Sequence, residues 1–187
     1  MIVGYQGIVG SHSERAAVEL MAQIGITEYT LDPCVTSAEV VARLEARRVD
    51  LGVLAVRNAV GGPVEETVDA MREHSVHEIA RCALPIIHGL YGRSPSGADR
   101  VETIYSHEQA LRQCARNIQR WYPKAICVAE QDTALAAERL AAGSYPECSA
   151  VICSSSAAGR LGLHPIRHPF QDRPDNLTEF VLIRSGA

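Results

Sequence analysis

The sequence lacks any long hydrophobic run. No apolar stretch in its 187 residues approaches the roughly 20 residues that span a bilayer, and Met1 leads into Ile-Val-Gly-Tyr without the regions of a signal peptide. We therefore expect no membrane partner and a cytoplasmic location. A strong charge is also missing, because the formal net charge is only -4 at pH 7, so we expect no nucleic-acid partner. A small molecule or a second copy of the chain, as a homodimer, is the expected partner.

Motifs for metals, nucleotides and covalent catalysis are absent as well. The six cysteines form no CxxC pair and the histidines form no HExxH motif. The sequence also lacks a nucleophile elbow, a P-loop and a GxGxxG fingerprint. We therefore expect free cysteines and no metal, and covalent and nucleotide-dependent mechanisms are disfavoured.

Strand-like runs alternate with helix-like runs along the whole chain. A 47% hydrophobic composition supplies a core for one large domain or two small lobes. The alternation predicts an α/β fold with mostly parallel sheets. The candidate strands are residues 1–5, 51–56, 101–105, 125–128, 150–153 and 180–183.

Capping signals mark the starts of the candidate helices. Three segments match the S/T-x-x-E/Q capping box, in which side chains satisfy the free backbone donors of a first turn. They are Ser11–Glu14, Thr36–Glu39 and Ser106–Gln109. Another helix is expected to open at Pro63 after two glycines. A further helix is expected to start at Asp132.

Two lobes are expected from the order of these segments. The stretch from Val76 to Arg93 is extended in character and could carry the chain from one lobe to the other. The strand that begins at Phe180 would then return to the first lobe. This interpretation assigns residues 1–78 and 168–187 to lobe 1 and residues 79–167 to lobe 2, with a cleft between them.

Polar segments at strand ends and helix starts are the candidate sites, because α/β folds commonly bind ligands there. They are Gly7–Glu14, Arg57–Gly62, Ser106–Gln113 and Asn176–Glu179.

Several of these polar side chains also have structural interpretations. Ser106, Gln109 and Gln113 would share one face of a helix, but spacing alone favours capping for the first two and solvent exposure for Gln113. Asn58 is equally a routine turn residue, and Thr178 is a β-branched residue entering a strand. Residue type alone therefore leaves the function open.

Three histidines are candidates for acid-base chemistry at neutral pH: His12, His88 and His107. His88, without a visible partner, is better interpreted as a hydrogen-bonded structural residue. His107 is expected in the first turn of a helix, where the dipole disfavours a protonated imidazole, so we expect it to be neutral.

The ordered motifs resemble those of the prephenate dehydratase family, which includes the arogenate dehydratases. The resemblance covers residues 4 to 183. It rests on the following segments: "GYQGIVGSHSERAA", "DLGVLAVRNAVGGPVEETVD", "LPIIHGL", "YSHEQALRQC" and "HPFQDRPDNLTEFVLI".

The resemblance implies two α/β lobes like those of type II periplasmic binding proteins, with the active site in the cleft. It also implies a cofactor-free elimination in which a cyclic carboxylate loses carbon dioxide and its ring hydroxyl. Thr178 would aid departure of the hydroxyl, while Asn58, Ser106 and Gln113 would orient the substrate. The other expected substrate-binding residues are Ser11, His12, Ser13, Arg57, Ala59, Gly61, His107, Gln109, Glu179 and Phe180.

Departures from the family pattern are concentrated at these positions. Arg57 stands where the family has Glu, and Glu179 stands where it has Arg. Ala59, Glu108 and His12 are further departures. We predict that residues 57 and 179 face each other and form the family's ion pair with reversed polarity. Such a pair could be a structural bridge, or it could relocate the charge that binds the substrate carboxylate.

The leading hypothesis is a lyase that converts prephenate, or a similar cyclic carboxylate, into an aromatic product such as phenylpyruvate. No regulatory ACT domain follows the catalytic motifs, so we expect a stand-alone copy recruited into secondary metabolism, for example in an aromatic or tropolone-type route. Two alternatives stay open, a different elimination or decarboxylation on a ring carboxylate and a non-catalytic binder of an anionic aromatic metabolite.

Overall fold

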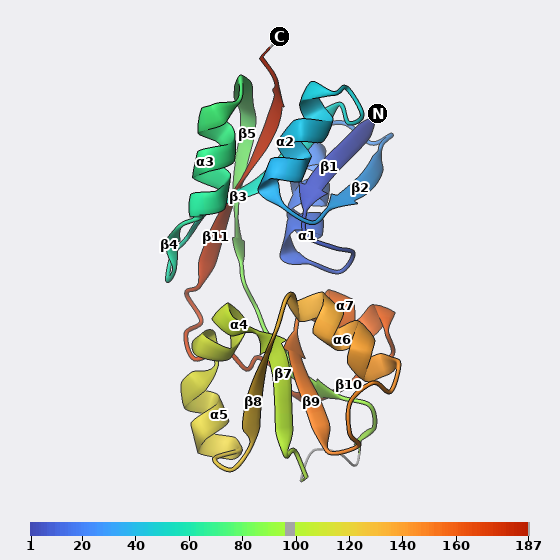
Figure 1. The fold of residues 1–187 in the computed structure, drawn as a ribbon, viewed down its shortest axis with the longest axis vertical. Helices are drawn as coiled ribbons and strands as arrows, with labels where there is room; N and C mark the ends of the chain where they lie inside the picture. Colours follow the sequence, from blue (N-terminus) through green and yellow to red (C-terminus); the bar gives the residue numbers. More distant parts are fainter. Residues whose placement is uncertain (96–99, 187) are drawn as a thin grey trace. The chain divides into compact units, whose positions relative to one another are not determined.

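The computed structural model describes residues 1–95 and 100–186 and consists of two compact units (Figure 1). Unit 1 contains residues 1–86 and the C-terminal segment from Asp175, and unit 2 contains Ile87–Pro174. Each unit is a β-sheet with helices packed against it, which confirms the α/β class. Among the described residues, no helix combines the length and apolar character needed to cross a membrane.

Unit 1 is built on a mixed sheet with the strand order β2-β1-β3-β11-β5. β1 pairs in parallel with β2 and β3, whereas β11 runs antiparallel between β3 and β5. The C-terminal strand thus returns to the first unit, as predicted, but the expected mostly parallel pairing holds only for part of the sheet. The strands are β1 (Ile2–Gln6), β2 (Thr30–Cys34), β3 (Leu51–Asn58), β5 (Val76–Pro85) and β11 (Leu177–Ser185), with the short β4 (Gly62–Pro63) paired to β3.

Helices cover both faces of this sheet: α1 (His12–Gln23) on one side, α2 (Ser37–Glu45) and α3 (Glu65–Glu73) on the other. Two predicted caps are confirmed, because Ser11 and Thr36 accept hydrogen bonds from backbone N–H groups in the first turns of α1 and α2. The predicted start at Pro63 is wrong. Pro63 lies in β4, because the glycine turn leads into a short antiparallel pairing before the helix begins at Glu65.

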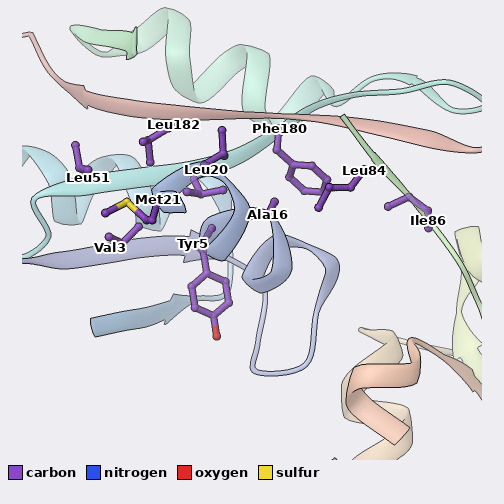
Figure 2. Close-up of a cluster of buried hydrophobic side chains, with 12 residues drawn as sticks. Val3, Tyr5, Ala16, Leu20, Met21, Leu51, Leu84, Ile86, Phe180 and Leu182 are labelled. Atoms are coloured by element: carbon purple, nitrogen blue, oxygen red, sulfur yellow. The ribbon is translucent and has the colours of Figure 1, made fainter. Parts of the chain in front are cut away.

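The core of unit 1 beneath α1 extends along β11 (Figure 2). Leu20 and Met21 of α1 meet Val53 of β3 and Leu182 of β11, all with no exposed area. Phe180 lies beside Leu84 at the end of this cluster. Burial of each such large apolar side chain contributes about 1.5–3 kcal/mol, so the end of β11 is firmly held.

Unit 2 is a second mixed sheet with the strand order β10-β6-β9-β7-β8. β7 pairs in parallel with β8 and β9, and β6 pairs antiparallel with β9 and β10. Residues of α4 and α5 pack with Ile104 and Ile152 in its core, and α6 contacts β7 and β9. Asp132 caps α6, as predicted. The elements are β6 (Gly89–Gly92), β7 (Thr103–His107), α4 (Glu108–Gln113), α5 (Ala115–Trp121), β8 (Ile126–Glu130), α6 (Thr133–Ala141), β9 (Ser149–Cys153), α7 (Ser155–Arg160) and β10 (His164–Arg167).

The division between the units falls later in the sequence than the expected lobe boundaries at residues 78/79 and 167/168. β5 stays in the sheet of unit 1 as far as Pro85. Phe170 is buried in the core of unit 2, and the Asp172 carboxylate accepts from backbone N–H groups at the start of α5. The six cysteines are free, as expected.

Candidate active site

A β-bulge sets the direction of the polar side chains at the end of β3. Phe180 of β11 faces Ala55, but the next residue toward the N-terminus, Glu179, faces Arg57, so β3 has one extra residue at this point. Such a bulge changes which side of a sheet the following side chains occupy. As a result Asn58 reaches the same side of the sheet as its cross-strand neighbour Thr178.

The Asn58 amide has all of its hydrogen-bonding groups engaged. Its Oδ1 accepts from the backbone N–H groups of Val60 and Gly61, at 3.0 and 2.8 Å. Since this fixes the oxygen toward the turn, Nδ2 must point the other way, where it donates to Asn176 Oδ1 at 2.9 Å and Thr178 Oγ1 at 2.8 Å. Asn58 therefore acts as a fixed support between a turn and the end of β11.

The Thr178 hydroxyl is consequently oriented as a donor. Its oxygen accepts from Asn58, and among the described residues no acceptor takes its proton. Thr178 is 7% exposed, so few water molecules can compete for that proton. A hydroxyl held in this way can donate to an oxygen of a ligand.

Asn176 completes this group, which we call the Asn58–Thr178 cluster. Asn176 is 2% exposed and its backbone carbonyl accepts from the Ile86 N–H at 2.8 Å. Its Oδ1 is occupied by Asn58, whereas its Nδ2 has no hydrogen-bond partner among the residues that the structure describes.

Arg57 and Glu179 face each other across the two strands, as predicted. Because side chains alternate along a strand, both point to the side of the sheet opposite Asn58 and Thr178. The predicted ion pair between them is wrong. Glu179 Oε2 lies 2.8 Å from Nη1 of Arg81 on β5, which also pairs with Glu78, while exposed Arg57 forms no ion pair within the described parts of the chain.

Unit 2 contains a second polar group around His88. The ring Nε2 lies 2.9 Å from Gln113 Oε1 at the end of α4, and Gln171 Oε1 accepts from the His88 backbone N–H at 3.1 Å. Burial lowers the pKa of His88, and its hydrogen bond to Gln113 only partly opposes this. A neutral His88 ring donates from Nε2 to the Gln113 oxygen. The amide N–H groups of Gln113 then point away from His88, and they have no hydrogen-bond partner among the described residues.

Ser106 and His107 differ from the predicted capping arrangement. Ser106 lies in β7 rather than on a helix, has no exposed area, and donates its hydroxyl proton to the Ile152 carbonyl at 2.5 Å. The cap of α4 is His107, whose Nδ1 accepts from the Gln109 N–H at 3.2 Å.

The remaining predicted site residues have local roles in the structure. Ser11 caps α1, whose first residues include His12 and Ser13. The Ala59 N–H donates to the Leu177 carbonyl, and the Gly61 N–H donates to Asn58. The Gln109 side chain is exposed on α4, and Phe180 is 2% exposed in the core of unit 1.

Two functional candidates were missed from the sequence. Asn176 belongs to the motif segment that contains Thr178, and its position two residues before this threonine is the signal that could have indicated it. Gln171 belongs to the same motif segment, but its contact with His88 could not be foreseen because it joins segments that are 83 residues apart. No group of three or more His, Cys, Asp or Glu side chains suited to a metal ion occurs among the described residues.

Known sequences match almost the whole chain. A model of the prephenate dehydratase family matches residues 3–187. A bifunctional chorismate mutase/prephenate dehydratase of Stutzerimonas stutzeri is 33% identical over 183 residues, which cover 98% of this chain and 48% of that protein. Arogenate dehydratase 5 of Arabidopsis thaliana, a chloroplastic protein, is 31% identical over 181 residues, covering 97% and 41%. The chain thus spans less than half the length of these relatives.

Solved structures agree with these matches. Prephenate dehydratase of Arthrobacter aurescens in complex with L-Phe has a TM-score of 0.89 and 26% identity, covering 100% of this chain and 61% of that one. A structure described as a novel type of quorum-quenching acylase has a TM-score of 0.82 and 26% identity, with 99% and 64% covered. A periplasmic substrate-binding protein of Coxiella burnetii, at a TM-score of 0.57 and 14% identity over 99% and 84%, confirms the expected likeness of fold. The chain belongs to the prephenate dehydratase family.

Proposed function

We propose that this protein is a lyase that removes carbon dioxide and water from prephenate, or from a closely similar cyclic carboxylate. Its relatives support a lyase-type enzyme. The observation that carries the proposal is the direction of the Thr178 hydroxyl, which accepts from Asn58 and keeps its proton for an external oxygen.

In the proposed reaction the bond between the ring and its carboxylate carbon breaks, and its electron pair forms a ring double bond. The bond between the ring and its hydroxyl breaks at the same time, and that electron pair leaves on the hydroxyl oxygen. A proton from solvent converts the departing hydroxide into water, so the products are carbon dioxide, water and an aromatic acid. Thr178 donates a hydrogen bond to the departing oxygen without giving up its proton.

This role suits an ordinary threonine. A free hydroxyl is a weak acid, so full proton transfer from Thr178 would leave an unstable alkoxide. A positioned hydrogen bond avoids that species and stabilises the charge that develops on the leaving oxygen. Asn58 supplies the positioning, because its own amide is fixed by the backbone of the turn.

Ser106 and Gln113 are proposed to orient the substrate. Gln113 can donate from its amide nitrogen, since His88 occupies its oxygen. Ser106 can only accept, since its proton is engaged by Ile152. The homodimer, the cytoplasmic location and a place in secondary metabolism remain predictions.

The direct test is to incubate the purified protein with prephenate near neutral pH and to follow phenylpyruvate by its absorbance in alkali. Turnover that depends on Thr178 supports the proposal. Saturable binding of aromatic acids without turnover would contradict it and favour a binder. Removal of an acyl group from an acylated quorum-sensing signal, with no turnover of prephenate, would instead favour an acylase.

A further inference from the structure

Asn176 is the one member of the Asn58–Thr178 cluster whose amide is only half engaged. Its Oδ1 accepts from Asn58 Nδ2 at 2.9 Å, and its Nδ2 is buried without a hydrogen-bond partner among the described residues. The opposite orientation of this amide is excluded. Asn58 presents an N–H to it, because the Asn58 oxygen is held by Val60 and Gly61.

A buried donor without a partner is unusual in a folded protein. Most buried polar groups are hydrogen-bonded, and one that is not carries the full cost of its desolvation. The neighbouring backbone gives no structural reason for it, because the Asn176 carbonyl is already bonded to the Ile86 N–H. An amide that served only to hold Asn58 would need its oxygen alone, so its nitrogen requires another explanation.

We propose that Asn176 is a second donor to the leaving oxygen of the substrate, beside Thr178. This inference rests on the proposed function. Asn176 Oδ1 and Thr178 Oγ1 both lie within 2.9 Å of the same Asn58 nitrogen, so the Asn176 amide and the Thr178 hydroxyl are neighbouring groups. A hydroxyl oxygen that departs with negative charge has lone pairs for both donors.

The chemistry of an amide suits this role. The amide carries no charge. It therefore does not stabilise the bound anionic substrate more strongly than it stabilises the transition state, in which charge is separated. Because its N–H groups are already out of water, they lose no hydration when the oxygen becomes negative. Asn176 would therefore act mainly on kcat and less on KM.

Substitution by aspartate separates this role from a structural one. Asn176→Asp keeps an oxygen that can accept from Asn58 but replaces the donor, whereas Asn176→Ala removes both. We expect Asn176→Asp to lower kcat for prephenate about 10²-fold, with a smaller change in KM. Wild-type kcat in a folded Asn176→Asp protein would overturn the proposal and leave Asn176 as a support for Asn58.

A spectroscopic measurement tests the donor independently of turnover. The side-chain amide signals of Asn176, identified by their loss in Asn176→Asp, are followed by ¹⁵N–¹H NMR during titration with cis-4-hydroxycyclohexanecarboxylate, which cannot become aromatic. Cyclohexanecarboxylate, which lacks the hydroxyl, is the control. We expect a downfield proton shift with the hydroxy acid alone. The absence of a hydroxyl-dependent shift overturns the role of Asn176, whereas failure of prephenate turnover by the wild-type protein would overturn the proposed function instead.

Discussion

Thr178 in unit 1 and Ser106 in unit 2 carry the same functional group in opposite hydrogen-bonding states. The Thr178 oxygen accepts from a fixed amide and its proton is unengaged by the described residues, whereas the Ser106 proton is donated to a backbone carbonyl. Thr178 can therefore stabilise a departing oxygen, and Ser106 can only accept. The family resemblance assigns both residues to the substrate site, but their hydroxyls are not chemically interchangeable.

The amides of the two units show the complementary difference. Asn58 is engaged at both ends and acts as a support for a hydroxyl. Gln113 is held at its oxygen by His88, so its nitrogen is the group left to donate. Asn58 thus fixes a hydroxyl donor, Thr178, in unit 1, whereas His88 fixes an amide donor, Gln113, in unit 2.

Removing the Thr178 hydroxyl should have the largest effect on activity. Thr178→Val keeps the shape of the side chain but removes the donor, and loss of one such donor typically lowers kcat about 10²–10³-fold. Thr178→Ser should retain most of the activity because it keeps the hydroxyl. Both variants are assayed by phenylpyruvate formation from prephenate, with thermal unfolding as the control for folding. Equal activity of the valine and serine variants would remove the distinction between Thr178 and Ser106.

Ser106→Ala should affect stability more than activity. The variant leaves the buried Ile152 carbonyl without its side-chain donor, and this type of loss costs about 1–3 kcal/mol. Because the Ser106 proton is not available to a substrate, we expect kcat to fall by less than about 10-fold. Denaturant unfolding and prephenate kinetics measure the two quantities. A large loss of kcat in a protein of unchanged stability would make Ser106 a donor like Thr178.

The sequence predicted the α/β class, the caps at Ser11 and Thr36 and the helix start at Asp132, because these depend on local patterns. The order of the segments predicted the return of the C-terminal strand. It also identified the motif residues Asn58 and Thr178. It could not predict the direction of their hydrogen bonds, because this depends on the bulge opposite Glu179 and on contacts between segments more than a hundred residues apart.

The Ser106 cap and the Arg57–Glu179 ion pair failed for different physical reasons. The capping box at Ser106 matched in sequence, but β7 extends through His107, so the serine is held in a strand by its pairing with β8. The cross-strand register of Arg57 and Glu179 was predicted correctly, yet an arginine on the other neighbouring strand takes the carboxylate. Register places two backbones together, whereas long side chains can pair diagonally.

The buried His88 should make stability depend on pH through unit 2. Its pKa in the folded state lies below the unfolded value near 6.5 because burial disfavours the charged ring. As the pH falls below about 6.5, the unfolded chain binds a proton that the folded chain does not, so the free energy of unfolding decreases, by at most about 1.4 kcal/mol per pH unit. His88→Gln should remove this part of the pH dependence. Denaturant unfolding of both proteins from pH 5 to pH 8 measures it, and parallel curves would contradict the prediction.

The smallest effect is expected on the other side of the unit 1 sheet, where the charges of Glu179 and Arg81 meet. Both side chains are partly exposed, at 37% and 47%, so water and salt screen their interaction. A double-mutant cycle with Glu179→Gln and Arg81→Gln should give a coupling energy below about 1 kcal/mol. The same cycle between Glu179→Gln and Arg57→Gln should give none, because Glu179 pairs with Arg81 instead. Since Arg57 points away from Thr178, Arg57→Gln should also leave kcat for prephenate nearly unchanged. A strong coupling between residues 57 and 179, or a large loss of kcat in Arg57→Gln, would return these charges to the substrate site.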